Sequence, residues 1–141
     1  VKNLIHSSLW AIIKNMQYSE ELMDHFKSPR NQGQIEDADG VGEVGNIKCG
    51  DVMKIYIKVG EERGDDTILE DVKFETLGCA AAIAATSVLT ELAKGKTFKQ
   101  AFAITKDDIV KKLGQVPALK YHCSVLAEEG LKKAIEDYKS K

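Results

Sequence analysis

The central part of the chain alternates between apolar and polar positions, which is the pattern of β-strands with one buried face. Over residues 52–59 the apolar side chains fall on one face and two lysines on the other. A second alternating run, residues 67–77, places Val72 and Phe74 inward. Because two strands alone are only marginally stable, we expect a third strand around residues 40–44.

After the second run the pattern becomes helical. Two long helices are predicted over residues 80–94 and 122–138, and two short helices between them begin at Thr97 and Thr105, which are good N-cap residues. A further short helix is expected over residues 19–27. Strands followed by helices predict an α+β fold, with a small three-stranded antiparallel sheet and helices packed on one face.

The length of 141 residues predicts one domain, over residues 16–141, preceded by an N-terminal extension at residues 1–15. The extension is apolar and contains the single tryptophan, Trp10. It is shorter than the roughly 20 apolar residues needed to cross a bilayer, and it lacks the cleavage site of a signal peptide. We expect no membrane association. The extension is expected to be either a flexible or loosely docked segment, or a small helix that docks on a partner or a second subunit. Its apolar surface would favour self-association into a homo-oligomer.

Composition and charge exclude some classes of function. The net charge is −2, and no basic patch with interleaved aromatic residues is present, so nucleic acid is not an expected partner. Three cysteines are an odd number for a disulfide framework. Thiols stay reduced in the cytoplasm, so we predict a cytoplasmic protein in which the cysteines bind a metal or act chemically.

Each cysteine has a distinct setting. Cys49 lies in a glycine-bounded polar loop with Asp51 two residues later, while Cys79 and Cys123 each begin a predicted helix. Thiolates are the ligating and nucleophilic form of cysteine, and helix N-termini favour them. A single cysteine is more often a core residue, but three in such settings indicate a soft, anionic, partly open metal site. Asp51 is a candidate oxygen ligand.

The histidines are less informative. Adjacent residues of a helix point about 100° apart, so His122 and Cys123 could share a site only if His122 lay outside the helix. His122 is therefore either a spare ligand or a surface residue, and His25 is expected at the surface. The residues alone leave open a soft metal site, for which a tetrahedral zinc site with these cysteines is one candidate, and a cysteine nucleophile, for instance a sulfur acceptor that forms a persulfide on Cys123.

Three cysteine segments, in this order, are similar to those of the IscU-type iron–sulfur cluster assembly scaffolds, the NifU N-terminal-like family. The similarity runs from about Tyr18 to Tyr138. The segments are Gly45-Asn46-x-x-Cys49-Gly50-Asp51, Gly78-Cys79-Ala80-Ala81-Ala82 and Lys120-Tyr121-His122-Cys123-Ser124.

The resemblance implies a protein that is not an enzyme. It implies a scaffold that assembles a [2Fe–2S] cluster on Cys49, Cys79 and Cys123 and passes it to apo-proteins such as ferredoxin. A cysteine desulfurase would deliver the sulfur, with Cys123 as first acceptor and Lys120 nearby. Asp51 and His122 both match family positions, and either is a candidate fourth ligand.

The sequence departs from the family pattern in two places. The second cysteine is commonly followed by Gly-Ser, but here Ala80 and Ala81 follow it. The bacterial chaperone-docking stretch Leu-Pro-Pro-Val-Lys is replaced by Val-Pro-Ala-Leu-Lys at residues 116–120, which argues against recognition by the specialised heat-shock chaperone.

Overall fold

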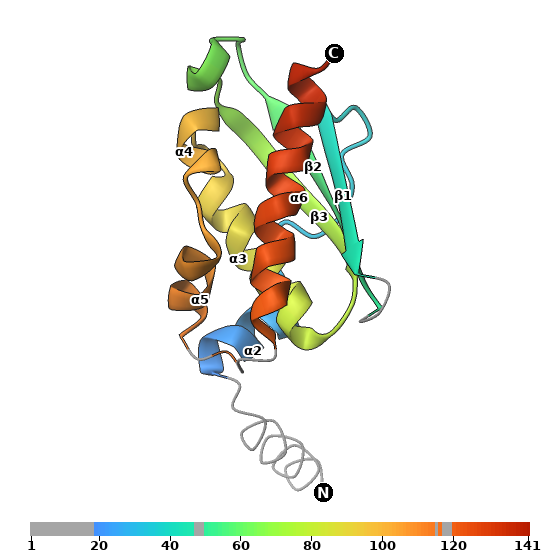
Figure 1. Ribbon diagram of the computed structural model, residues 1–141, viewed down its shortest axis with the longest axis vertical. Coiled ribbons are helices and arrows are strands. Elements are labelled where there is room, and N and C mark those ends of the chain that lie inside the picture. The colour runs from blue at the N-terminus through green and yellow to red at the C-terminus, as the bar shows by residue number, and fades with distance from the viewer. Residues whose placement is uncertain (1–18, 47–49, 115, 117–119) are drawn as a thin grey trace, which may run out of the picture.

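The computed structural model of the chain describes residues 19–46, 50–114, 116 and 120–141. It has two layers, a three-stranded antiparallel sheet and a layer of helices on one face of that sheet (Figure 1). The predicted α+β class and the three-stranded sheet are therefore confirmed. The predicted extension, residues 1–15, lies outside the described residues.

The strands follow one another in space in chain order. They are β1 (Gly40–Asn46), β2 (Asp51–Val59) and β3 (Leu69–Leu77). In the central rung, Ile55 of β2 pairs with Gly42 on one side and with Phe74 on the other. Ile55 and Phe74 are fully buried beneath the helices, as the alternating pattern predicted.

Strand β3 begins two residues later than predicted, because Thr67 belongs to the turn before it. Its hydroxyl donates a hydrogen bond to the carbonyl of Gly64 at 2.8 Å and accepts one from the backbone N–H of Arg63 at 2.8 Å. These bonds close a short 3-10 turn, η1 (Gly64–Asp66). The side-chain chemistry of threonine thus favours the turn over the sheet at this position.

The helices agree closely with the sequence pattern. Thr97 and Thr105 each form a capping box, with Gln100 and Asp108 respectively, and this explains why two short helices begin there. None of the described helices is both long and apolar enough to cross a membrane. The helices are α2 (Glu20–Lys27), α3 (Ala80–Ala93), α4 (Phe98–Phe102), α5 (Lys106–Leu113) and α6 (Tyr121–Lys139).

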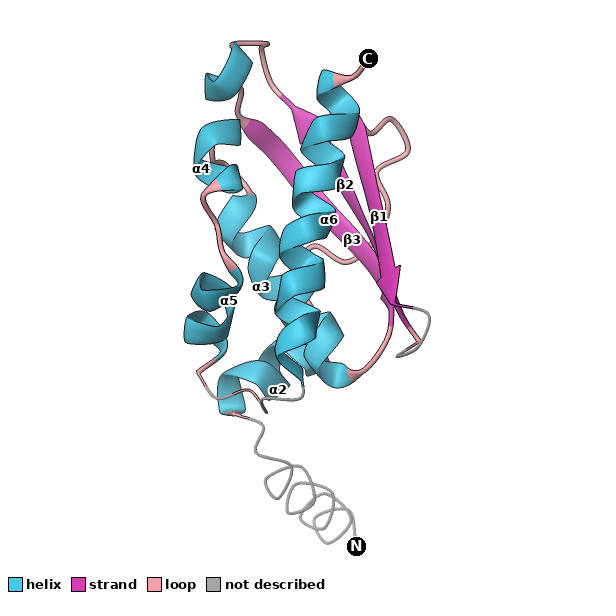
Figure 2. Cartoon of the chain, viewed as in Figure 1, coloured by secondary structure: helices cyan, strands magenta, loops and turns pink. Residues whose placement is uncertain are grey.

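Helix α6 lies directly on the sheet, beside β1 and β2 (Figure 2). The close approach depends on two glycines that face one another, because a Cβ atom at Gly42 would overlap the carbonyl oxygen of Gly130. A Cβ atom at Gly130 would in turn press on the side chain of Ile55. The distance between α6 and the sheet is therefore fixed near the middle of the helix.

The contact between α2 and α3 is polar and buried, which corrects one expectation. His25 was expected at the surface, but only 7% of it is exposed. Its Nδ1 lies 2.8 Å from the Ser87 hydroxyl, and its Nε2 lies 3.3 Å from Glu91. Ser87 also accepts the backbone N–H of Arg30 at 2.9 Å. The polar side of α2 faces polar residues of α3, so the helical pattern of α2 alone could not reveal the burial.

Candidate functional site

Two of the three cysteines meet where α3 and α6 begin. Cys79 is the N-cap of α3, and Cys123 lies in the first turn of α6. Their Sγ atoms are 3.8 Å apart, although 44 residues separate them in sequence. Within the described part of the chain, neither forms a disulfide. At this distance both sulfurs can bind one metal ion, or two ions of one small cluster, after small side-chain movements.

Cys79 is the more accessible of the two thiols. It is half-buried and follows Gly78, whereas Cys123 is completely buried. The backbone of Cys79 is extended, with φ −79° and ψ 174°, and its side chain makes no capping bond to α3. Since the N-terminus of a helix favours nearby negative charge, the sulfur lies where an anionic ligand is favoured.

His122 contacts the site from within the helix, which corrects the expectation that it could share a site with Cys123 only from outside the helix. Helix α6 begins at Tyr121, so His122 is helical, yet its Nε2 lies 3.6 Å from the Sγ of Cys123. The imidazole is long enough to reach back to the neighbouring sulfur despite the angular separation of the two residues. This contact places an ionisable ring beside the buried thiol.

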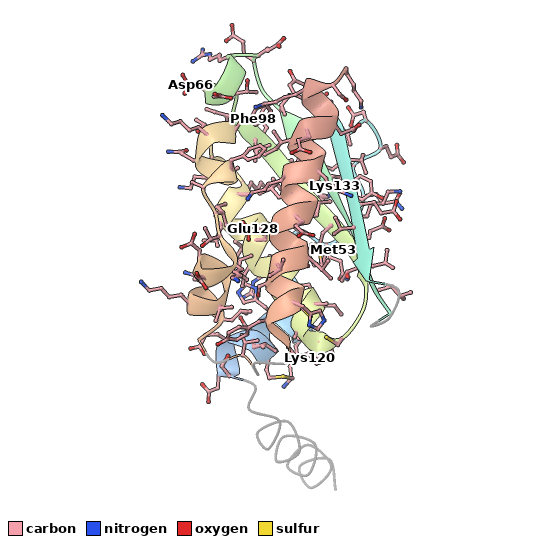
Figure 3. All side chains as sticks on the ribbon, in the orientation of Figure 1. Met53, Asp66, Phe98, Lys120, Glu128 and Lys133 are labelled. Carbon is pink, nitrogen blue, oxygen red and sulfur yellow. The ribbon has the colours of Figure 1, made fainter. Side chains whose placement is uncertain are left out.

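For the remaining predicted site residues, the structure gives at most a position in the fold. Lys120 is half-buried at the N-cap position of α6, at the end of the molecule where α2 also lies (Figure 3). Asp51 begins β2, and its backbone pairs with that of Asn46. Cys49 lies outside the described residues. Within the described part of the chain, no three His, Cys, Asp or Glu side chains form a group that could hold a metal ion.

Three exposed apolar side chains, the adjacent Val52 and Leu77 of the sheet and Tyr121 at the start of α6, were not singled out from the sequence. Leu77 is 74% exposed and lies directly opposite Val52 in the sheet, one residue before Gly78. Tyr121 precedes His122 and is also exposed. The alternation of Val72 and Phe74 inward does place Leu77 on the outer face, so the signal was present. The adjacent exposed pair of Val52 and Leu77 is a candidate site of protein contact.

Comparison with known proteins found chains of similar sequence. A family model described as the NifU-like N-terminal domain matches residues 17–141. The iron–sulfur cluster assembly scaffold protein IscU 1 of Archaeoglobus fulgidus is 56% identical over 121 residues, which cover 86% of this chain and 76% of that protein. The IscU scaffold protein of Escherichia coli K12 is 49% identical over 129 residues, covering 89% and 97%.

Solved structures share the fold. The crystal structure of a putative iron–sulfur cluster assembly scaffold protein for the SUF system, from Fervidobacterium islandicum AW-1, aligns with a TM-score of 0.64 and 29% identity over 84% of this chain and 96% of that one. A NifU-like N-terminal protein of Brucella abortus aligns with a TM-score of 0.69 over 87% and 94%, at 16% identity, and supports the fold alone. The chain belongs to the NifU-like N-terminal domain family.

Proposed function

We propose that this protein is a scaffold on which a [2Fe–2S] cluster is assembled and from which it is transferred to apo-proteins. The observation that carries the proposal is the 3.8 Å contact between the Sγ atoms of Cys79 and Cys123, in a chain whose relatives are named iron–sulfur cluster assembly scaffolds. Cysteine thiolates are the usual ligands of such clusters. The cluster is the cargo of the protein, so no catalytic turnover is required.

A scaffold must hold the cluster and also release it. In our proposal Cys49, Cys79 and Cys123 supply three thiolates, and a weaker, non-thiolate ligand takes the fourth position. Asp51 is favoured because only Gly50 separates it from Cys49. A carboxylate is a hard ligand, which competes poorly with the thiolate of an acceptor protein. His122, 3.6 Å from the Cys123 sulfur, is the alternative.

Sulfur would come from a cysteine desulfurase that carries a persulfide. The Cys123 thiolate attacks the outer sulfur of that persulfide, which forms a persulfide on Cys123 and releases the desulfurase thiolate, so no outside oxidant is needed. Lys120 adds positive charge near this end of α6. Because Cys123 is completely buried, the delivery requires this end of the molecule to open first. The adjacent, exposed side chains of Val52 and Leu77 are suited to contact with the desulfurase.

The experiment is anaerobic reconstitution of the full chain with ferrous iron, cysteine and a cysteine desulfurase. We expect visible charge-transfer absorption and about two irons and two sulfides per cluster. The double variant Cys79→Ser with Cys123→Ser is the negative control. Transfer is then measured with apo-ferredoxin as the acceptor.

Other results would overturn the proposal. Zinc binding in place of iron, with no visible absorption, would indicate a zinc protein that uses the same cysteines. Extra sulfur on a cysteine without any bound metal would indicate a sulfur acceptor. In each case the chain would be expected to act in the cytoplasm, where thiols stay reduced.

A further inference from the structure

A groove lies between α3, α4 and α5, and the proposed cluster chemistry does not use it. Its volume is about 540 Å³, within the range of about 300–1,000 Å³ typical of ligand sites. Leu92 and Ile104 form its apolar floor. Leu92 lies nearly the full length of α3 from Cys79, roughly 20 Å at 1.5 Å per residue, so this part of the groove is well separated from the cysteines.

The rim of the groove is basic. Lys96, Lys111 and Lys112 line it, and all three are exposed. Within the described residues, none of the three makes an ion pair, whereas the paired lysines lie elsewhere in the fold. Among the described residues that line the groove, Asp108 is the only acidic one, and its carboxylate already accepts the backbone N–H of Thr105 at 2.9 Å. The groove therefore carries unbalanced positive charge above an apolar floor.

We propose that this groove binds an acidic, amphipathic segment of a partner protein. Apolar side chains of that segment would contact Leu92 and Ile104, and its carboxylates would pair with Lys96, Lys111 and Lys112. An amphipathic helix laid into a groove is a common mode of peptide recognition, and it presents both kinds of side chain at once. Charge complementarity favours an acidic amphipathic segment over amphipathic segments that are neutral or basic.

The chain itself offers two other occupants, and both are less suitable. Residues 1–15 are apolar but contain Lys2 and Lys14 and no acidic residue, so the lysine rim would repel them. The exposed loop at residues 61–66 of a second copy is acidic, but Glu61 already pairs with Arg63 and Asp65 with Lys139 in its own chain. A partner protein is therefore favoured over the chain's own segments.

The test uses the full chain labelled with nitrogen-15 and a synthetic helical peptide with leucines at i, i+3 and i+4 spacing and glutamates elsewhere. A scrambled peptide of equal composition is the control probe. We expect saturable shifts at backbone amides of α3, α4 and α5, which weaken with added salt because surface charges are screened. The scrambled peptide should bind more weakly, since it cannot place its leucines on one face.

Variants make the test specific. Lys111→Glu with Lys112→Glu should weaken peptide binding at least about tenfold, because each exposed ion pair contributes up to about fivefold and the reversed charges repel. Lys99→Glu with Lys133→Glu changes the net charge equally at exposed positions that do not line the groove, and should alter binding by less than about twofold. Leu92→Ala should weaken binding several-fold.

Four results would overturn the proposal. They are the absence of saturable binding, shifts confined to other surfaces, equal losses in the two double variants, and equal binding of the scrambled peptide. A mass that rises with protein concentration, and that Lys111→Glu with Lys112→Glu abolishes, would assign the groove to a second copy of the chain instead.

Discussion

The Nδ1 atom of His25 lies 2.8 Å from the hydroxyl of Ser87, and this contact joins α2 to the helix that begins at Cys79. Ser87 is fully buried, and its hydroxyl also accepts the N–H of Arg30. Burial lowers the pKa of His25 below its usual 6.5, the positive charge of Arg30 lowers it further, and Glu91 partly opposes the shift. The packing of α2 on α3 therefore favours the neutral imidazole.

The first prediction follows from that pKa. The folded state binds fewer protons at His25 than the unfolded state, so the free energy of unfolding has its full value above pH 6.5 and falls as the pH decreases through 6.5 toward the folded-state pKa. Urea unfolding at several pH values measures this. His25→Gln should cost about 1–3 kcal/mol near neutral pH, because Ser87 loses its partner, and the cost should shrink in acid.

The variant Ser87→Ala separates the effect of protonating His25 from the effect of losing its contact with α3. It removes the partner of Nδ1 but keeps the imidazole, so its stability should still fall in acid. If the difference between wild type and His25→Gln were the same at all pH values, the titration of His25 would not contribute.

The second prediction concerns the three thiols. Cys49→Ser, Cys79→Ser and Cys123→Ser should each lose most of the iron and sulfide bound after reconstitution, because a serine oxygen replaces a thiolate ligand. Ser124→Ala is a matched control beside Cys123, since the buried Ser124 hydroxyl has no hydrogen-bond partner among the described residues and its loss should leave the fold intact. Any single serine variant with wild-type iron, sulfide and spectrum would remove that cysteine from the ligand set.

The third prediction concerns sulfur delivery. Brief exposure to a desulfurase without iron should add sulfur to Cys123, and peptide mass spectrometry identifies the modified residue. Exposure alone would favour Cys79, because Cys123 is the buried thiol. The experiment therefore distinguishes acceptance controlled by opening of the site from acceptance controlled by surface access. Sulfur found on Cys79 or Cys49 and absent from Cys123 would refute the assignment.

The fourth prediction concerns release of the cluster. Asp51→Ala should slow transfer to apo-ferredoxin and leave a longer-lived cluster, because it removes the hard ligand that an acceptor thiolate displaces. His122→Ala serves as the comparison, since its Nε2 lies near the Cys123 sulfur. Transfer rates and visible spectra of both variants are measured side by side. Normal transfer by Asp51→Ala, with an altered spectrum in His122→Ala, would make the imidazole the fourth ligand.

Local chemistry explains which parts of this fold the sequence could predict. Thr97 and Thr105 cap their helices with residues only three positions away, and strand alternation depends on neighbours two positions away, so both signals lie within a short window. The burial of His25 could not be predicted in this way, because it depends on Ser87, which is 62 residues away.

The candidate site also combines features that the sequence predicts with features that depend on tertiary packing. The positions of Cys79 and Cys123 at the N-terminal ends of helices were predicted from the sequence, but the 3.8 Å separation of their sulfurs depends on how α3 and α6 pack together. The contact between His122 and the Cys123 sulfur depends on the conformation of the imidazole side chain, which the angle between successive residues of a helix does not predict. The exposure of Leu77 follows from strand alternation and could have been predicted.

The glycine contact between β1 and α6 affects how mutants of this protein should be interpreted. Helix α6 has 19 residues, about 28 Å at 1.5 Å per residue, and Gly130 lies near its midpoint. A larger residue at Gly42 would displace or tilt α6 as a whole, and the N-terminal end of α6, which carries Cys123, would then move relative to Cys79. In a genetic screen, a substitution in the sheet could thus mimic the loss of a cysteine. Low iron content in such a mutant would indicate a displaced ligand, although every ligand is still present.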